Sequence, residues 1–573
     1  MGKSFTREEP SFTKLLGILV AVCLVAQVLT AGIGHLYNET DGQYGGAAKV
    51  MAEGGSWLIP ENNGIPRLVK PPLLYWTMAG AMKVFGVNEF SARLPNALAI
   101  TAWAVATFIL GSLWAGPWRG FVAGSILVTM LGSFTLARIV MPEPLFAALI
   151  AWALVCAAKG VTDEPKRKLW FLGFWLCAAL AAFTKGWHGF LYPLAIVAVT
   201  ALFHAPSRQA LKGLLSWQGA LIFLAINAPW FAYVESQFPG YLRNLIFSEQ
   251  LGHVTGSEAP ATSFTNVPRL QFFALHIAWF FPWSLAAGVA LLCRKDEGVK
   301  GRRFETVLIA TWGLLIAGSL LVVGQRQDYY AMAAWPAFAL AAAAITTRAG
   351  VRIGSGIVTA LLLLGLIAAA LLPGFLEGRE TATVAERSTA MNTVLNFGPE
   401  VWGSLTTTAL WTLGAALIFA ALGALSRSSK VGACALAACG LCLGWGAVSG
   451  MSIVSPFFSL AQTADEFVEN RPDGLRVVFE GDIDTGSSLL FYTKERLHLL
   501  GPSPDQDFIV RTQGIGQNSF WNEEIFLKEW NSSVPVILVT ESANLPSWEA
   551  RMGIAPRVLT RCGTQVLVAN FFR

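Results

Sequence analysis

Charged residues are scarce in this chain of 573 residues, at 13% of the sequence. Soluble proteins carry about 25% charged residues. Hydrophobic residues make up 54% of the chain, and the mean hydropathy is +0.53. A soluble chain of this length would form several domains and need far more polar surface. The scarcity of charge therefore excludes a cytosolic enzyme and a disordered chain, and it predicts a protein that crosses a membrane several times.

Cysteine is also scarce, with eight residues in the whole chain. Seven lie in apolar stretches, and Cys562 is alone in the polar C-terminal part, so an internal disulfide is excluded there. The chain is therefore not a disulfide scaffold. Cys439 and Cys442 form a C-x-x-C pair inside an apolar stretch, and we interpret them as packing residues rather than as redox or metal-binding groups.

Long apolar runs recur through the first four-fifths of the chain. The hydrocarbon core of a membrane is about 30 Å thick, which a helix of about 20 apolar residues can cross. By this measure the sequence predicts thirteen membrane-spanning helices. They are placed at 13–34, 92–114, 119–137, 144–160, 169–184, 187–204, 216–234, 271–293, 306–324, 329–347, 353–374, 408–425 and 432–454.

The distribution of lysine and arginine predicts the orientation of these spans. Short loops on one side of the membrane contain 18 of these residues in about 60 positions, and the loops on the other side are longer and poorer in them. Cytoplasmic loops are enriched in lysine and arginine, so the pattern places the N-terminus in the cytoplasm. An odd number of spans then places the C-terminal segment outside, in the periplasm of a bacterial inner membrane.

The composition changes near Gln462, where charged residues return. We therefore expect a transmembrane domain at 1–460 and a soluble extracytoplasmic α/β domain at 461–573. The predicted fold class is a polytopic α-helical membrane protein with this soluble domain at its end. The domain lacks a glycine-rich phosphate loop. A helix is predicted at Trp521–Trp530, and strands are predicted at Leu475–Glu480, Leu489–Tyr492, Phe508–Arg511, Val534–Thr540 and Gln565–Asn570.

The large first outside loop, at 35–91, holds two acidic residues just after the first span. Glu39 and Asp41 lie at the outer membrane edge, where a carboxylate is costly unless it is paired, bound to a cation or solvated in a cavity. The same loop predicts a helix over 42–54 and an interfacial helix over Leu73–Phe85, which is too short to span the membrane.

The short second outside loop adds a third carboxylate, Glu143, at the same membrane edge. Pro144 suits the first turn of the following helix, and a negative charge there is favoured by the helix dipole. Taken alone, each of the three acids can be explained as a structural charge at the start of a helix. Three acids on one face of the membrane together favour a functional site.

Basic and aromatic side chains are predicted at the same level. The cations are Lys70, Lys185, Arg243 and Arg326, with Arg269 beside them. They could bind a phosphate or diphosphate head group, or they could anchor the spans by reaching into the interface. Tyr329 and Tyr330 precede a span, where either aromatic anchoring or substrate contact explains them.

A metal site stays open in the loop between the seventh and eighth spans. Glu249 and His253 are four residues apart, which puts them on one face of a helix. Such a pair could hold a divalent metal, but two ligands alone do not make a zinc site.

Two motifs in the first outside loop resemble the GT-C superfamily of membrane glycosyltransferases. The family pattern is an acidic pair after the first span, an aromatic-bearing helix, and K-P-P-L-x-Y-W. Here the pattern reads Glu39-Thr40-Asp41-Gly42-Gln43-Tyr44 and Lys70-Pro71-Pro72-Leu73-Leu74-Tyr75-Trp76. Glu143 resembles the acid of the family's second loop, and Thr184-Lys185-Gly186 resembles its T-K-G-P turn. The nearest groups are bacterial protein O-mannosyltransferase-like enzymes and lipid A aminoarabinose transferases.

The sequence departs from these groups at three points. The acidic pair is split as Glu39 and Asp41, which leaves open which of them is catalytic. Val69 precedes Lys70 where aminoarabinose transferases carry a metal-binding glutamate, and Gln250 stands where they carry a histidine.

The resemblance implies transfer of a hexose or pentose from a polyprenyl-phosphate donor, such as undecaprenyl phosphate, to a lipid-linked or protein acceptor in the cell envelope. Glu39 or Asp41 would act as the base, and Glu143 would position the acceptor or hold a cation. The four cations would bind the donor phosphate, and the aromatic residues would contact substrate or lipid. Those aromatic residues are Tyr44, Tyr75, Trp76, Tyr329 and Tyr330. A flippase for a lipid-linked sugar and a noncatalytic membrane scaffold are the alternatives.

Overall fold

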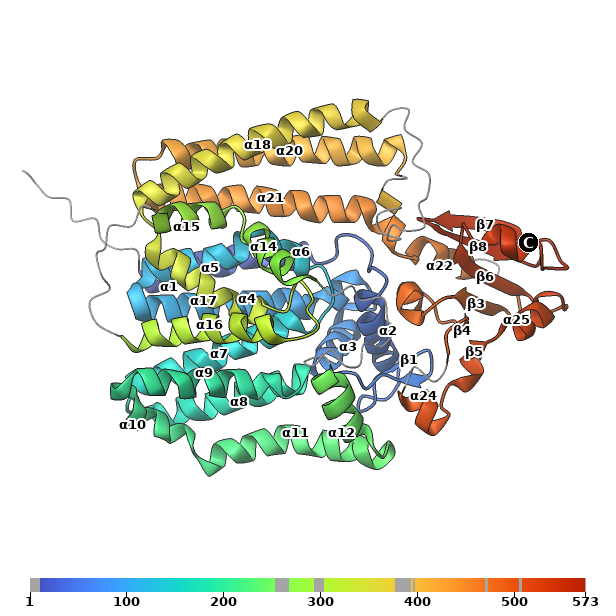
Figure 1. Cartoon of the computed structure of the whole chain (residues 1–573), viewed down its shortest axis with the longest axis horizontal. Helices are drawn as coiled ribbons and strands as arrows, with labels where there is room; N and C mark the ends of the chain where they lie inside the picture. Colours follow the sequence, from blue (N-terminus) through green and yellow to red (C-terminus); the bar gives the residue numbers. More distant parts are fainter. Residues whose placement is uncertain are drawn as a thin grey trace, which may run out of the picture.

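The structure is a computed structural model that describes residues 11–252, 267–292, 303–376, 393–394, 397–468, 472–503 and 508–571. A long bundle of helices is followed by a mixed sheet at one end of the bundle (Figure 1). Between them lie two helices of the first outside loop, α2 (Thr40–Ala52) and α3 (Leu73–Phe85), and a small hairpin, β1 (Glu61–Asn62) and β2 (Ile65–Pro66). The first outside loop is thus enclosed between the two parts of the chain.

Helices occupy all thirteen stretches that the apolar runs predict. The bundle consists of α1 (Phe12–Cys23) with η1 (Leu24–Val28), α4 (Glu89–Ala115), α5 (Pro117–Thr129), α6 (Leu131–Leu136), α7 (Glu143–Thr162), α8 (Arg167–Lys185), α9 (His188–Phe203), α11 (Trp217–Gln237), α14 (Arg269–Trp279), α15 (Trp283–Leu292), α16 (Phe304–Val322), α17 (Trp335–Ile345), α18 (Arg348–Leu376), α20 (Pro399–Leu425) and α21 (Ser429–Phe458).

Eight of the described helices are long and apolar enough to cross a membrane, or ten if each sharply bent pair counts as one span. One such pair is α14 and α15, which meet at an angle of 101°. Two further apolar helices, Phe12–Val28 and Met332–Ile345, are shorter. The number thirteen therefore stays a prediction, although every predicted stretch is helical.

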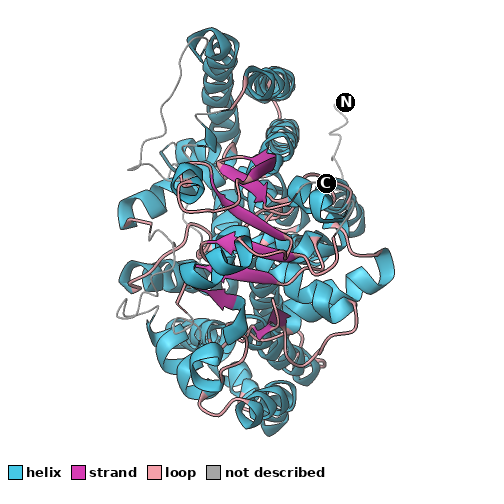
Figure 2. Ribbon diagram, turned by 90° about the vertical axis from the view of Figure 1, so that its right-hand side faces the viewer, coloured by secondary structure: helices cyan, strands magenta, loops and turns pink. Residues whose placement is uncertain are grey.

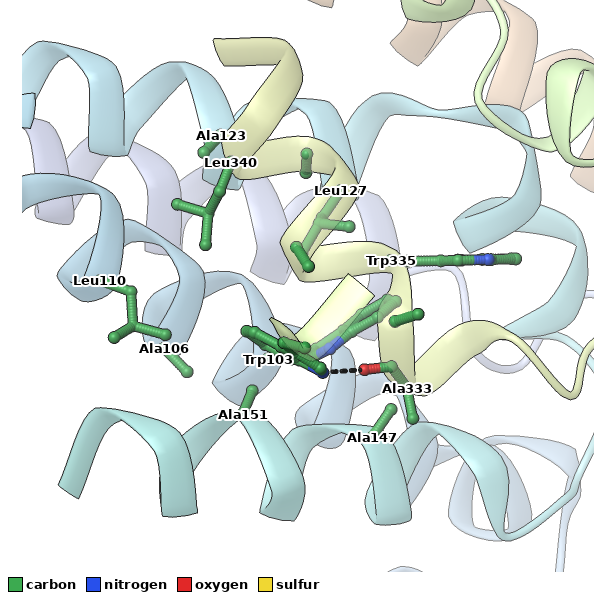
Figure 3. Packing of buried hydrophobic residues seen from close by; sticks show 14 of the residues in the cluster. Trp103, Ala106, Leu110, Ala123, Leu127, Ala147, Ala151, Ala333, Trp335 and Leu340 are labelled. Atoms are coloured by element: carbon green, nitrogen blue, oxygen red, sulfur yellow. Dashed lines mark hydrogen bonds between the residues drawn. The ribbon is translucent and has the colours of Figure 1, made fainter. Parts of the chain in front are cut away.

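Small residues let the central helices of the bundle approach closely (Figure 3). Alanines of α4, α5 and α7 share one buried cluster with Trp103 and Trp335, whose rings are 6.0 Å apart. The indole N–H of Trp312 donates to the carbonyl of Ala333 at 2.7 Å, so a buried polar group of this core is satisfied. This core holds the loop ends that carry the candidate site.

The C-terminal part forms a six-stranded sheet in the order β5-β4-β3-β6-β8-β7 (Figure 2). The first four strands are parallel, and the last two run antiparallel to their neighbours. Val477 and Phe479 face one side of the sheet, and Val478 faces the other. In order along the chain, the strands are β3 (Arg476–Glu480), β4 (Leu497–Leu500), β5 (Phe520–Trp521), β6 (Val536–Glu541), β7 (Arg557–Cys562) and β8 (Gln565–Ala569).

Short helices cover both faces of this sheet. Phe526 and Trp530 of one helix pack with Val478, and Leu489 of another packs with Val477. The helices on the sheet are α22 (Ala461–Val468), α23 (Ser488–Tyr492), α25 (Glu523–Trp530) and α26 (Leu545–Glu549). A further short helix, α24 (Phe508–Gln513), packs through Ile509 against Leu68 and Trp230 instead.

Two predicted strands of the C-terminal part are wrong. Leu489–Tyr492 lies in the helix α23, and Phe508–Arg511 lies in the helix α24. A short run of apolar residues has no period that separates a buried helix turn from a buried strand. In α23 the run is apolar on all sides because Leu489 faces the sheet and Phe491 packs against α2. The strands predicted at Leu475–Glu480, Val534–Thr540 and Gln565–Asn570 are present as β3, β6 and β8.

Candidate active site

Asp41 is fully buried in the first turn of α2. Its carboxylate accepts the backbone N–H of Tyr37 at 3.0 Å and that of Val140 from the second outside loop. The guanidinium of Arg93 lies 3.6 Å away. Burial raises the pKa of Asp41, and the nearby Arg93 and the two backbone donors counteract that shift. The carboxylate thus ties the two outside loops together.

Arg93 is a site residue that the residue-by-residue reasoning did not select. It is 1% exposed, and it donates to the carbonyls of Gly34 and His35, both at 2.7 Å, and of Arg138 at 2.8 Å. A buried ionisable group inside a predicted span is a signal that could have found it. Arg93 and Asp41 together fix the start of α2 against the bundle.

Glu39 stands at the N-cap of α2 and differs from Asp41 in its surroundings. Its side chain is exposed, although the surrounding chain desolvates it enough to raise its carboxyl pKa. Because Asp41 is enclosed by hydrogen bonds and Glu39 is accessible, Glu39 is the better placed of the two to meet a substrate.

Glu143 and Lys185 form an ion pair that joins two helix ends. Glu143 begins α7, Lys185 ends α8, and their charged atoms are 2.7 Å apart. The ammonium of Lys185 also lies 4.7 Å from the centre of the Tyr330 ring, a cation–π distance. The second carboxylate oxygen of Glu143, Oε2, is buried without a hydrogen-bond partner in the part of the chain that the structure describes. It is therefore available to accept a substrate hydroxyl.

Lys70 of the first loop extends the cluster of Glu143 and Lys185. Lys70 is partly buried directly before α3, and burial lowers its pKa. The charges of Glu249 and Glu143 raise the pKa of Lys70, and those of Lys185 and Arg67 lower it. All of them are therefore close to the Lys70 ammonium.

Stacked aromatic rings support the guanidinium of Arg67. Tyr44 of α2 and Tyr75 of α3 stack with ring centres 5.2 Å apart. Arg67 lies 5.4 Å from the centre of the Tyr44 ring and interacts with the Tyr75 hydroxyl. Arg67 was not among the predicted cations. Its place three residues before Lys70 in the same loop is the only sequence signal for it.

The remaining predicted aromatic residues have two different settings. The indole of Trp76 packs edge-on against Phe183, with ring centres 5.3 Å apart, and donates to the carbonyl of Trp57 at 2.5 Å. It therefore holds α3 against α8. Tyr329 and Tyr330 have ring centres 5.4 Å apart, and Tyr330 lies beneath Lys185. Tyr330 thus belongs to the cluster of Glu143 and Lys185.

Two predicted phosphate-binding arginines lie in other surroundings. Arg326 is 3% exposed, and its guanidinium donates to the carbonyl of Val323. Arg243 is exposed at the end of the short helix α12 (Tyr241–Arg243). Their roles in phosphate binding stay predictions.

The predicted metal pair is described only in part. Glu249 lies in the π-helix η4 (Asn244–Leu251), where its charge acts on Lys70, and His253 lies outside the described residues. Within the described ranges no three histidine, cysteine, aspartate or glutamate side chains are grouped to hold a metal ion. A metal at Glu249 stays a prediction.

The chain is similar to a family of membrane glycosyltransferases. Residues 37–242 match the family model described as dolichyl-phosphate-mannose-protein mannosyltransferase. The chain is 29% identical over 340 residues to an uncharacterized protein of Aquifex aeolicus, a match that covers 57% of this chain and 62% of that protein. These findings confirm the resemblance to membrane glycosyltransferases that the sequence motifs predict.

The chain is also similar to an arabinosyl transferase in sequence and to a solved ArnT structure in fold. The chain is 24% identical over 288 residues to the undecaprenyl phosphate-alpha-4-amino-4-deoxy-L-arabinose arabinosyl transferase of Shewanella sediminis, covering 49% of this chain and 51% of that enzyme. The matches thus span about half to three-fifths of the length of these relatives. The crystal structure of ArnT from Cupriavidus metallidurans bound to undecaprenyl phosphate superimposes with a TM-score of 0.82 at 19% identity, covering 98% of this chain and 99% of that one. The chain therefore has the fold of that protein.

Proposed function

We propose that the protein transfers a sugar from a polyprenyl-phosphate donor to a lipid-linked or protein acceptor at the periplasmic face of the inner membrane. The observation that carries the proposal is the cluster of Glu143, Lys185, Lys70 and Arg67, which meets α2, the helix that Glu39 caps, where Arg67 contacts Tyr44. It combines cations for a phosphate with a carboxylate for a hydroxyl. The fold shared with an ArnT that binds undecaprenyl phosphate supports a donor of this class.

The basic side of the site suits the phosphate of the donor. Lys70, Lys185 and Arg67 come from two loops and gather around Glu143 and Tyr44. When the bond between the sugar and the phosphate oxygen breaks, the polyprenyl phosphate leaves with the electron pair and gains negative charge. Fixed cations at that point stabilise the developing charge more in the transition state than in the bound donor.

The acidic side of the site suits the acceptor. The acceptor hydroxyl oxygen forms a bond to the anomeric carbon, and its proton passes to the carboxylate of Glu39. The raised pKa of Glu39 brings its basicity closer to that of a working general base. Asp41 keeps α2 in place, and the unpaired oxygen of Glu143 orients a hydroxyl of the acceptor or of the sugar.

The class of sugar is the open part of the proposal. A pentose fits the similarity to arabinosyl transferases, and a hexose fits the mannosyltransferase family model. The test is mass spectrometry of envelope glycolipids and glycoproteins from cells with and without the protein. One glycan unit missing from a single acceptor class supports the proposal and names the sugar. Unchanged glycolipids and glycoproteins, with purified protein inactive toward polyprenyl-phosphate pentoses and hexoses, would refute it.

A further inference from the structure

The backbone of Glu39 has an unusual conformation. Its φ is 64° and its ψ is −117°, and Asn63 is the only other non-glycine residue with positive φ in the described ranges. Such a conformation is strained for a residue with a side chain, and it persists only when its surroundings enforce it.

The C-terminal part supplies most of the contacts that hold Glu39. The Glu39 N–H donates to the carbonyl of Asp484 at 2.7 Å, and the Glu39 carbonyl accepts the hydroxyl of Ser487 at 2.8 Å. Both partners lie at η6 (Ile483–Gly486) or directly after it. The preceding residue is held in the same way, because Ser488 donates to the Asn38 side chain at 2.6 Å.

The fit between α2 and this segment is close. A side-chain carbon at Gly42 would lie 2.2–2.4 Å from backbone atoms of Ser487 and Ser488, so only glycine allows the contact. Further along α2, the ammonium of Lys49 donates to the carbonyl of Phe491 at 2.8 Å. The start of α2 and the start of α23 therefore form one rigid contact, about 440 residues apart in the sequence.

The same turn brings a carboxylate to the edge of the candidate active site. The side chain of Gln43 donates to the Asp484 carboxylate. The charges of Arg67 and Glu39 both act on Asp484, so its carboxylate lies near the two halves of the site.

We infer that residues 484–488 of the C-terminal part position the active site, with Ser487 as the positioning residue that holds Glu39 in its strained backbone conformation and aims its carboxylate at the acceptor. The inference rests on the proposed role of Glu39 as the base. It assigns the C-terminal sheet a part in catalysis through its hold on α2 rather than through contact with the reacting atoms.

Two variants break this contact, and each has a matched control. Ser487→Ala removes the hydroxyl that donates to Glu39, and Gly42→Ala forces α2 away from α23. Ser532→Ala, at an exposed serine whose hydroxyl bonds only the backbone of its near neighbours Glu529 and Val534 among the described contacts, and Gly80→Ala, with open space in α3, are the controls. We expect kcat of the full-length protein to fall about tenfold in each test variant, the effect of one lost hydrogen bond of about 1.4 kcal/mol, with KM for the donor unchanged.

Hydrogen exchange measures the contact without any substrate. The amide of Glu39 is expected to exchange about tenfold faster in Ser487→Ala and in Gly42→Ala, and at the wild-type rate in both controls. Unchanged exchange overturns the inference. Faster exchange with an unchanged kcat also overturns the inference, because the function of the Glu39 carboxylate would then not depend on the contact with Ser487. If Gly42→Ala does not fold, Ser487→Ala decides. Wild-type protein that transfers no sugar would refute the proposed function alone, since the exchange result is independent of activity.

Discussion

The basic and acidic halves of the candidate site are held in different ways. The basic groups lie on helix ends and on the first loop, whose Asn63 and Leu68 also touch the C-terminal part. The backbone of Glu39, in the acidic half, is hydrogen-bonded to the C-terminal part directly. Lys185 and Glu143 join the ends of two bundle helices, and Lys70 and Arg67 come from the loop that packs on them. Glu39, in contrast, is held by Asp484 and Ser487. If the proposed roles hold, substitutions at residues 484–488 should act on activation of the acceptor more than on binding of the donor phosphate.

The largest effect is expected in the basic half, from Lys70→Ala. If Lys70 binds the donor phosphate as proposed, its loss removes a cation that stabilises the departing phosphate, so kcat should fall about 100- to 1000-fold. Transfer assays with purified protein measure it. Lys83→Ala, at an exposed lysine near the end of α3, the helix that follows Lys70, is the control and should keep wild-type kcat. A Lys70→Ala protein as active as the control would contradict a phosphate-binding role.

The ion pair of Glu143 and Lys185 should give the next largest effect, on stability as well as activity. The two side chains are 7% and 18% exposed, so removal of one charge leaves the other poorly solvated. We expect Glu143→Ala to destabilise the protein by about 3 kcal/mol. A double-mutant cycle with Lys185→Ala, followed by thermal unfolding in detergent, measures the coupling. Additive single effects would mean that the pair does not hold α7 and α8 together.

In the acidic half, we expect a smaller effect from Asp484, a pH dependence of the free energy of unfolding. Burial, with the nearby Asp482 and Glu39, raises its pKa from 3.8 to about 6, against the opposing charge of Arg67. The folded protein therefore binds this proton more tightly than the unfolded chain does. Above pH 6 the carboxyl is ionised, and its burial lowers the free energy of unfolding. This destabilisation disappears as the pH falls toward 4 and the carboxyl takes up a proton.

Between pH 7 and pH 5, wild type should gain about 1 kcal/mol of stability relative to Asp484→Asn, which has no carboxyl to titrate. Thermal unfolding of both proteins at the two pH values measures the difference. A wild type that loses stability relative to Asp484→Asn on acidification would show the opposite sign of pKa shift.

The smallest effect is expected from Arg243→Ala. Its side chain is exposed at the end of α12, so we expect a change in kcat of less than about twofold, the usual outcome at an exposed position. A fall as large as that of Lys70→Ala would restore Arg243 to the phosphate site predicted from the sequence.

The sequence predicts local structure well where apolar periodicity is long or turn chemistry is strong. The helix α3 spans the predicted residues, Leu73–Phe85, and Glu143 and Pro144 begin α7 as the prolines and the charge indicate. The strand predicted at Leu489–Tyr492 is a helix instead, because four apolar residues carry too little pattern to separate the two.

Contacts between distant segments could not be predicted in the same way. Lys185 was selected as a cation and Glu143 as an acid, yet nothing in either loop indicates that they pair. Asp484 and Ser487 stand more than 440 positions from Glu39, in a turn without a recognised motif. The choice between Glu39 and Asp41 likewise needed the buried partner Arg93, whose hydrogen bonds depend on the tertiary fold.

The central claim, that Glu39 serves as the base in sugar transfer from a polyprenyl-phosphate donor, is tested most directly by single-turnover transfer with purified wild-type and Glu39→Gln proteins. Both should bind undecaprenyl phosphate equally well, because the cations are intact. The wild type should transfer the sugar, and Glu39→Gln should do so at least about 100-fold more slowly, the effect of losing a general base. Equal transfer rates in the two proteins would contradict the account.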